Sequence, residues 1–137
     1  MSRESRVFAG ILLVVLPTVM FGGLSLLKFL TSNEAGYVDN PLRQDLFRAG
    51  HAHAGVYLVL SLVMLRYVDE AVLGPFWKWL ARTGAPIAAI LIPAAFFLSV
   101  HSPGAREPNG LINLAYVGAF FLAAAVLTLG VGLIRRS

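Results

Sequence analysis

The sequence predicts an all-α integral membrane protein: four transmembrane helices in an antiparallel bundle, with both termini in the cytoplasm. Of its 137 residues, 58% are hydrophobic and only 13% are charged, whereas about 25% of the residues of a soluble domain are charged. Four apolar runs are long enough to cross a hydrocarbon core of about 30 Å as helices. Most basic residues stand near the ends of these runs. We therefore expect a multi-pass protein of the cell membrane that forms a single domain over residues 1–137.

The apolar runs define the predicted spans, which we place at residues 7–30, 46–65, 85–100 and 110–134. The first run exceeds the roughly 7 to 15 apolar residues of a secretory signal, so we expect it to be retained. The second helix should begin before the membrane, because Asn40 and Pro41 combine a side-chain cap with a proline in the first turn.

The third span is the shortest of the four. Trp77, Lys78 and Trp79 lie before it and predict a cytoplasmic interfacial helix, with the indoles at headgroup level and the lysine in water. Pro103 and Gly104 mark the turn between the third and fourth spans.

The distribution of basic residues predicts the orientation of the bundle. Seven lie on the side of the termini: Arg3, Arg6, Arg66, Lys78, Arg82, Arg135 and Arg136. Four lie on the other side: Lys28, Arg43, Arg48 and Arg106. Because cytoplasmic loops carry an excess of basic residues, this bias places both termini in the cytoplasm. The basic residues form no patch interleaved with exposed aromatic residues, so we expect no nucleic-acid partner.

The second span carries a polar stripe. Gln44, Arg48, His51 and Gly55 share one face of a regular helix. That face should point into the bundle or into an outward-open cavity, because the same groups facing lipid would be costly. Arg48 should also pair with Asp45, three residues earlier on the helix.

His53 lies about 200° around the helix from His51, so the two imidazoles cannot bind one ion side by side on a regular helix. His53 is instead expected to hydrogen-bond with Tyr57, four residues later. We therefore assign His53 a structural role and His51 a functional one.

The partner side of the predicted pocket comes from the third and fourth spans. Ser99 and His101 end the third span, and His101 should approach His51 at the outer end of the bundle. Asn113 and Tyr116 begin the fourth span on the face of Asn109. Two interpretations stay open for this face: it lines a cavity, or Asn109 caps the helix and Tyr116 joins the interfacial aromatic belt. The predicted pocket-lining residues are Gln44, Arg48, His51, Ser99, His101, Asn113 and Tyr116.

Three histidines on two apolar helices suggest a metal or haem site. The chain has no cysteine, which excludes thiolate-ligated metals and covalently attached c-type haem. Imidazoles of His51 and His101, with His53 as a further candidate, would suit haem b or a transition metal such as copper. The His-x-His pattern resembles the histidine-bearing helices that ligate copper and haem in membrane oxidases and oxygenases. Those enzymes have many more helices, so the resemblance does not extend to their activity.

Three functions remain open from the sequence. The first is a non-enzymatic accessory or lipid-binding component of a membrane assembly, with an outward-facing polar pocket. Its partners would be membrane lipids, other membrane subunits or further copies of the chain. The second is a redox protein that binds metal or haem b through His51 and His101. The third is a membrane enzyme acting on lipids, with His51 as general base near Glu34 or Asp45.

Overall fold

The computed structural model describes residues 1–135, and these form four long helices without a strand. The helices are α1 (Arg3–Thr31), α2 (Pro41–Tyr67), α3 (Pro75–Ser99) and α4 (Leu114–Ile134), and a short 3₁₀ turn, η1 (Gly110–Asn113), leads into α4. All four are long and apolar enough to cross a membrane, with η1 and α4 forming one such stretch. The described residues are therefore all-helical, and their length and composition fit four membrane-spanning helices of a multi-pass membrane protein. Arg136, one of the basic residues counted above, lies outside the described residues.

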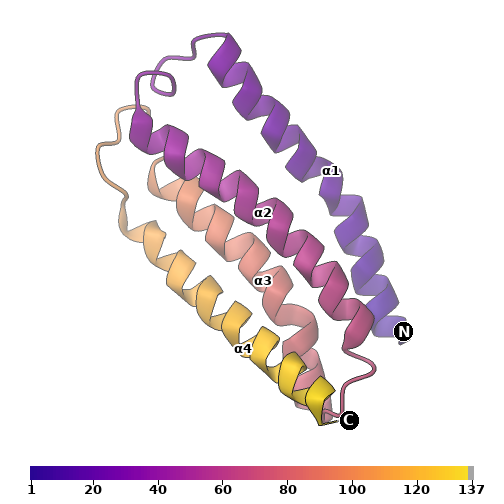
Figure 1. Cartoon of the computed structure of the whole chain (residues 1–137). Coiled ribbons are helices and arrows are strands. Elements are labelled where there is room, and N and C mark those ends of the chain that lie inside the picture. The colour runs from indigo at the N-terminus through magenta and orange to yellow at the C-terminus, as the bar shows by residue number, and fades with distance from the viewer. Residues whose placement is uncertain (136–137) are drawn as a thin grey trace.

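The helices follow one another across the molecule, and both termini lie at the same end (Figure 1). We call this the terminus end, and the opposite end, which carries the loops after α1 and α3, the loop end. Helix α3 packs against both α2 and α4, whereas α1 packs mainly against α2. In the most apolar stretch of α1 only 6% of the residues are buried, compared with 44% in α3. Helix α1 is thus the peripheral helix of the bundle.

Small residues bring α3 and α4 close together. A Cβ added to Gly84 would lie 2.7 Å from the Phe121 carbonyl oxygen, and one added to Gly118 would lie 2.7 Å from the Ile92 side chain. Contacts this close leave no space for a side chain, as expected where membrane helices pack through small residues. A cluster of buried residues continues this packing toward the terminus end: Met64, Val68, Ala71, Ala81, Ala85, Ala125 and Leu129.

Two predicted helix starts are confirmed, and a third differs from the prediction. The Asn40 side chain accepts a hydrogen bond from the Arg43 amide (3.2 Å), and Pro41 opens α2. The Asn109 side chain accepts one from the Leu111 amide (2.9 Å) and caps η1. Trp77, by contrast, belongs to the first turn of α3 itself, because Pro75 already begins that helix. The tryptophan-rich segment is therefore continuous with the third helix and is not a helix of its own.

A buried arginine fastens the loop end. The Arg43 guanidinium donates to the carbonyl oxygens of Val100 (2.9 Å) and His101 (3.3 Å), just after α3, and also to that of Gly36. These carbonyls carry the partial negative charge of a helix C-terminus, which a cation stabilises. Gly36 has a φ of +71°, and a Cβ there would lie 2.5 Å from Pro103. Arg43 therefore ties both loops at this end together.

A second buried arginine fastens the terminus end. Arg82 of α3 pairs with Asp69 (2.6 Å) and donates to the Ser5 hydroxyl (3.1 Å). The Ser2 amide also donates to Asp69 (2.7 Å). Burial raises the pKa of Asp69, but hydrogen bonds from Ser2, Ser5 and Arg82 outweigh it and hold the pKa at about 2. This cluster attaches the start of α1 to the rest of the bundle.

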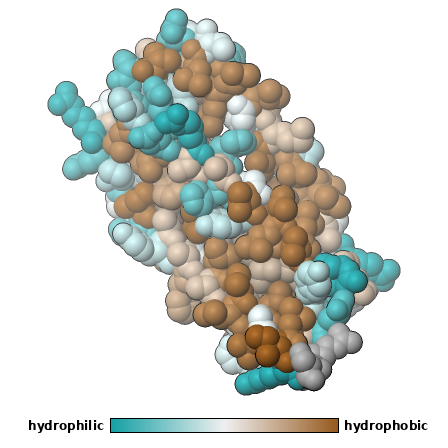
Figure 2. Space-filling model, in the orientation of Figure 1, coloured by the Kyte–Doolittle hydropathy of each residue, from teal (hydrophilic) through white to brown (hydrophobic). Residues whose placement is uncertain are grey.

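The surface has the character expected of a membrane protein. Hydrophobic residues dominate the middle of the molecule, and hydrophilic residues gather toward its two ends (Figure 2). Many large apolar side chains of α1 and α4 are exposed, including Val14, Phe21, Phe120 and Leu127. Such a broad exposed apolar surface fits contact with lipid or with other membrane helices.

Candidate functional site

Three members of the polar stripe of α2, Gln44, His51 and Gly55, face α1 or the loop after it. The Gln44 amide donates to the carbonyl oxygens of Tyr37 (2.8 Å) and Val38 (3.0 Å). Two turns further along α2, a Cβ added to Gly55 would lie 3.8 Å from the Val19 side chain. The stripe therefore contributes to the packing between α1 and α2.

Arg48 is the exposed member of the stripe. It pairs with Asp45 at 2.5 Å, as the sequence predicts, and the side chains of Arg48 and Asp45 are 61% and 69% exposed. Pairs this exposed contribute little to stability, about 0–1 kcal/mol. Arg48 therefore points outward and does not face the interior of the bundle.

His51 is half-buried between α1 and α2, against two glycines. A Cβ added to Gly23 would lie 2.9 Å from Nε2 of His51, and one added to Gly22 would lie 3.7 Å from Nδ1. Within the described residues the imidazole has no hydrogen-bond partner. A polar ring without a partner at membrane depth is costly and marks a candidate functional position.

His53 packs on the opposite side of α2. Its Nδ1 donates to the Ala49 carbonyl oxygen (2.6 Å), and its ring contacts those of Tyr57 and Phe96, each with centroids 5.3 Å apart. Tyr57, the predicted hydrogen-bond partner of His53, thus contacts it only through its ring. The hydrogen bond of the His53 side chain goes to the backbone of α2 instead. These contacts agree with a structural role for His53.

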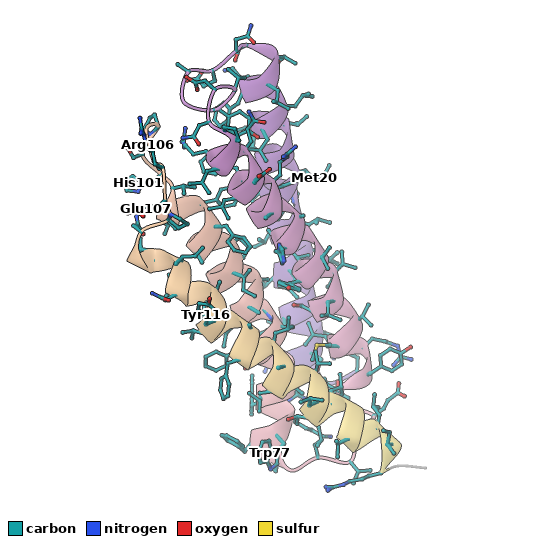
Figure 3. All side chains as sticks on the ribbon, turned by 60° about the vertical axis from the view of Figure 1, so that its left-hand side comes forward. Met20, Trp77, His101, Arg106, Glu107 and Tyr116 are labelled. Carbon is teal, nitrogen blue, oxygen red and sulfur yellow. The ribbon has the colours of Figure 1, made fainter. Side chains whose placement is uncertain are left out.

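The expected approach of His51 and His101 is not found. A Cβ on Gly50 would lie 3.0 Å from the Phe97 ring, so His51 is level with Phe97 on α3. His101 lies four residues later, beyond the end of α3 and roughly 6 Å further along at helical rise. It is exposed near the α3–α4 loop (Figure 3), and its Nδ1 lies 3.0 Å from the Leu98 carbonyl oxygen. The end of α3 agrees with the predicted end at residue 100, so the difference comes from the register between α2 and α3, which sets Phe97 and not His101 level with His51.

The candidate metal ligands are not gathered in one cluster in the described part of the chain. No three histidine, aspartate or glutamate residues there come together in a group that could hold a metal ion. His51, His53 and His101 each have different neighbours. Ligation of haem b or copper by these imidazoles therefore finds no support in the geometry.

The other predicted pocket residues are also dispersed. Ser99 is buried, and its hydroxyl donates to the Phe96 carbonyl oxygen (3.3 Å). The Asn113 amide donates to the carbonyl oxygen of Gly110 (3.0 Å) within η1. Tyr116 is 75% exposed and lies on the outer face of α4 (Figure 3). Of the two interpretations, this position favours the aromatic belt over a cavity.

A polar depression does exist at the loop end, but other residues form it. It measures about 410 Å³ and lies between residues 39–42 and residues 103–106. Asn40 is one of the lining residues, and its side-chain amide donates to the carbonyl oxygens of Pro103 (3.1 Å) and Ala105 (2.9 Å) on the other side of the depression. None of the predicted pocket-lining residues is among those that surround it.

The structure also contains an apolar cavity of about 380 Å³ between α1 and the α2–α3 pair, which was not predicted from the sequence. Its α1 wall runs from Phe8 to Val19, and the facing wall is formed by Ala54, Leu58, Pro86, Ala89 and Ile90. The cavity ends about one turn from His51, because Ala54 follows His51 by three residues on α2. The small side chains of Ala54 and Ala89 create this space, but only the placement of α1 shows that they face each other.

A comparison with known proteins finds no family model, no curated protein and no solved structure that matches this chain. The apolar cavity and the residues around it are therefore the basis for a functional assignment.

Proposed function

We propose that this protein is a non-enzymatic membrane component that holds the apolar chain of a membrane lipid between α1 and the α2–α3 pair. The four helices span the membrane as an antiparallel bundle with both termini in the cytoplasm. Two observations support this topology: both termini lie at the same end (Figure 1), and that end carries the larger number of basic residues.

The apolar cavity is the observation that carries the proposal. Its volume of about 380 Å³ falls within the roughly 300–1,000 Å³ of small-molecule sites. Apolar side chains around an empty space lose dispersion contacts, and a bound hydrocarbon chain would restore them. The cavity also lies within the apolar part of the bundle, where acyl chains are the surrounding solvent. A lipid chain is therefore the occupant that matches both the chemistry and the location.

The attachment of α1 explains how a chain could enter. Helix α1 is fastened at the terminus end by Ser2 and Ser5, and at the loop end by the ring contact of Phe29 with Tyr37 (centroids 5.5 Å apart). Between these points, the stretch from Phe8 to Val19 forms one wall of the cavity and is exposed to the surroundings on its other face. A small outward movement of this stretch would open the cavity to the bilayer.

An accessory role in a larger assembly fits the same features. The exposed apolar faces of α1 and α4 provide surfaces for other membrane subunits or further copies of the chain. The redox alternative gains no support from the described residues, among which no three histidine or acidic side chains form a group that could hold a metal ion. The lipid-enzyme alternative needs an acid beside His51, but Asp45 pairs with Arg48, and the His51 imidazole forms no hydrogen bond with Glu34 within the described residues. No specific observation favours either.

Photolabelling with a phospholipid that carries a diazirine in its acyl chain tests the proposal. The protein is reconstituted with this lipid, irradiated and digested, and labelled peptides are located by mass spectrometry. We expect labels on residues 8–19 of α1 and residues 86–90 of α3. Ala89→Phe, which fills the cavity, should lower this labelling several-fold, because the larger ring occupies the space of the chain.

Ala123→Phe is the matched control, since Ala123 lies exposed on α4 away from the cavity. It should leave the labelling of residues 8–19 and 86–90 unchanged. Equal labelling of both variants would show that the labels come from bulk lipid and would overturn the proposal. A haem absorbance band or bound metal in the purified protein would restore the redox alternative.

A further inference from the structure

A second groove lies at the terminus end, between the start of α3 and the end of α4. It measures about 280 Å³ and is lined by Leu73, Trp77, Leu127, Thr128, Val131 and Arg135. Figure 3 shows Trp77 at this end of the bundle. The groove lies apart from the α1 cavity and shares no lining residue with it.

Arg135 is the charged group of this groove. Within the described residues its guanidinium forms neither an ion pair nor a hydrogen bond. Of the other arginines at this end, Arg66 pairs with Glu70 and Arg82 pairs with Asp69. In the part of the chain that the structure describes, the guanidinium groups of Arg3 and Arg6 form no ion pair or hydrogen bond, but these residues do not line the groove. Arg135 therefore remains available for an anion from outside the chain.

Thr128 is the second unusual group. Hydroxyls inside membrane helices commonly donate to a carbonyl oxygen of the preceding turn. Thr18, Ser25, Ser61 and Thr83 all do so here, at 2.6–2.9 Å. Thr128 makes no such bond among the described residues, so its hydroxyl can donate into the groove.

The spacing of the two polar groups matches a lipid better than a free anion. Thr128 and Arg135 are seven residues apart, which places them on one face of α4 and about 10 Å apart along the axis. Arg135 is at the end of the helix, where lipid phosphates lie. Thr128 is deeper, toward the level of the glycerol esters, and the apolar side chains of Leu127 and Val131 accompany it.

The wall of the groove is held in place by backbone contacts. The Val72 amide donates to the Gly132 carbonyl oxygen (2.9 Å), which links the α2–α3 loop to α4. A Cβ on Gly132 would lie 2.6 Å from Leu73, so Leu73 packs directly on this helix. The groove is thus formed by the fold before any ligand arrives.

We infer that this groove binds an anionic glycerophospholipid, with its phosphate on Arg135, an ester carbonyl on the Thr128 hydroxyl and an acyl chain along Leu127 and Val131. Trp77 lies at the membrane interface beside the headgroup, where amphipathic indoles are favoured. An arginine matches a phosphate well in charge and geometry. This site does not depend on the α1 cavity or on the orientation of the bundle.

Tryptophan fluorescence tests the inference, because the chain has only two tryptophans. In a Trp79→Phe background, Trp77 is the sole reporter. The protein is placed in vesicles that contain phosphatidylglycerol or phosphatidylcholine with the same brominated acyl chains. Brominated phosphatidylglycerol should quench Trp77 at about fivefold lower mole fraction, the preference expected from one basic residue at a bilayer surface.

Matched variants assign the effect to the groove. Arg135→Gln should abolish the preference for phosphatidylglycerol, whereas Arg135→Lys should retain it. Arg106→Gln removes the same charge at the loop end and should change nothing. Thr128→Val should weaken quenching by both lipids, because both carry ester carbonyls, whereas Thr83→Val should leave quenching unchanged.

Three results would overturn the inference. One is equal quenching by the two lipids in the parent protein. Another is a preference that persists in Arg135→Gln. The third is loss of the preference when inorganic phosphate is added at constant ionic strength, because this would show a site for a free anion and not for a lipid.

Discussion

At the scale of single residues, the contact of His51 with Gly22 and Gly23 is the feature that links the polar stripe to α1. The glycines provide space for an imidazole that a larger residue would displace. Because small residues also allow helices to approach closely, this contact sets the separation of α1 and α2 near the cavity. Substitutions of His51 and of the two glycines should therefore have coupled effects on the stability of the fold.

Substitution of Gly23 tests this coupling. Gly23→Ala places a Cβ 2.9 Å from Nε2 of His51, so we expect a loss of about 1–3 kcal/mol in unfolding free energy, as for other overpacked sites. Combining it with His51→Ala should relieve the crowding and give a coupling energy above about 0.5 kcal/mol. Denaturant titration in detergent micelles measures these values.

Gly10→Ala is the control on the same helix, because a Cβ there would meet nothing within 4 Å. It should be close to neutral or slightly stabilising, since alanine favours helix more than glycine does. If Gly23→Ala is no less stable than Gly10→Ala, the packing of His51 against α1 does not require a glycine at position 23.

At the scale of helices, the sequence predicts elements better than it predicts their contacts. Asn40 and Pro41 mark the start of α2 correctly, since a side-chain cap and a first-turn proline act locally. The end of α3 near residue 100 was also predicted correctly, but the approach of His101 to His51 was not, because it depends on the register between α2 and α3. No local pattern encodes that register.

The two buried arginines illustrate the same limit. From the sequence, Arg43 and Arg82 are read only as signals of topology, because basic residues at the ends of apolar runs usually face water. In the structure, each binds groups that are distant along the chain, such as Val100 for Arg43 and Ser5 for Arg82. Their roles become visible only when the loops they join are brought together.

The attachment of α1 at the terminus end should depend on pH. The pKa of Asp69 is about 2 in the folded protein, below its ordinary value of 3.8. A lowered folded pKa adds stability above pH 3.8, and this is lost as pH falls toward 2. The difference corresponds to about 2 kcal/mol of unfolding free energy.

Asp69→Asn should remove this acid-sensitive part of the stability and lower the unfolding free energy at neutral pH, because Arg82 would stay buried without an anion. Asp45→Asn is the control, since Asp45 and Arg48 form an exposed pair. Unfolding free energies measured between pH 6 and pH 2 would contradict the assignment if the two variants followed the same curve.

At the scale of the whole molecule, the burial of Arg43 and Arg82 leaves the predicted orientation intact. Each belongs to a different end, so removing both from the count leaves six basic residues against three. The bias toward the terminus end persists, and with it the expectation that this end faces the cytoplasm. The phospholipid groove would then open to the cytoplasmic leaflet, which is rich in anionic lipids.

Cysteine labelling provides a direct test, because the natural chain has no cysteine to remove. Gly74 and Gly104 lie in loops at opposite ends of the bundle, and a Cβ at either position would meet nothing within 4 Å. We expect a membrane-impermeant maleimide to label Gly104→Cys in intact cells and to label Gly74→Cys only after permeabilisation. Labelling of both from one side would rule out a four-span bundle, whereas the reversed pattern would retain the bundle and invert its orientation.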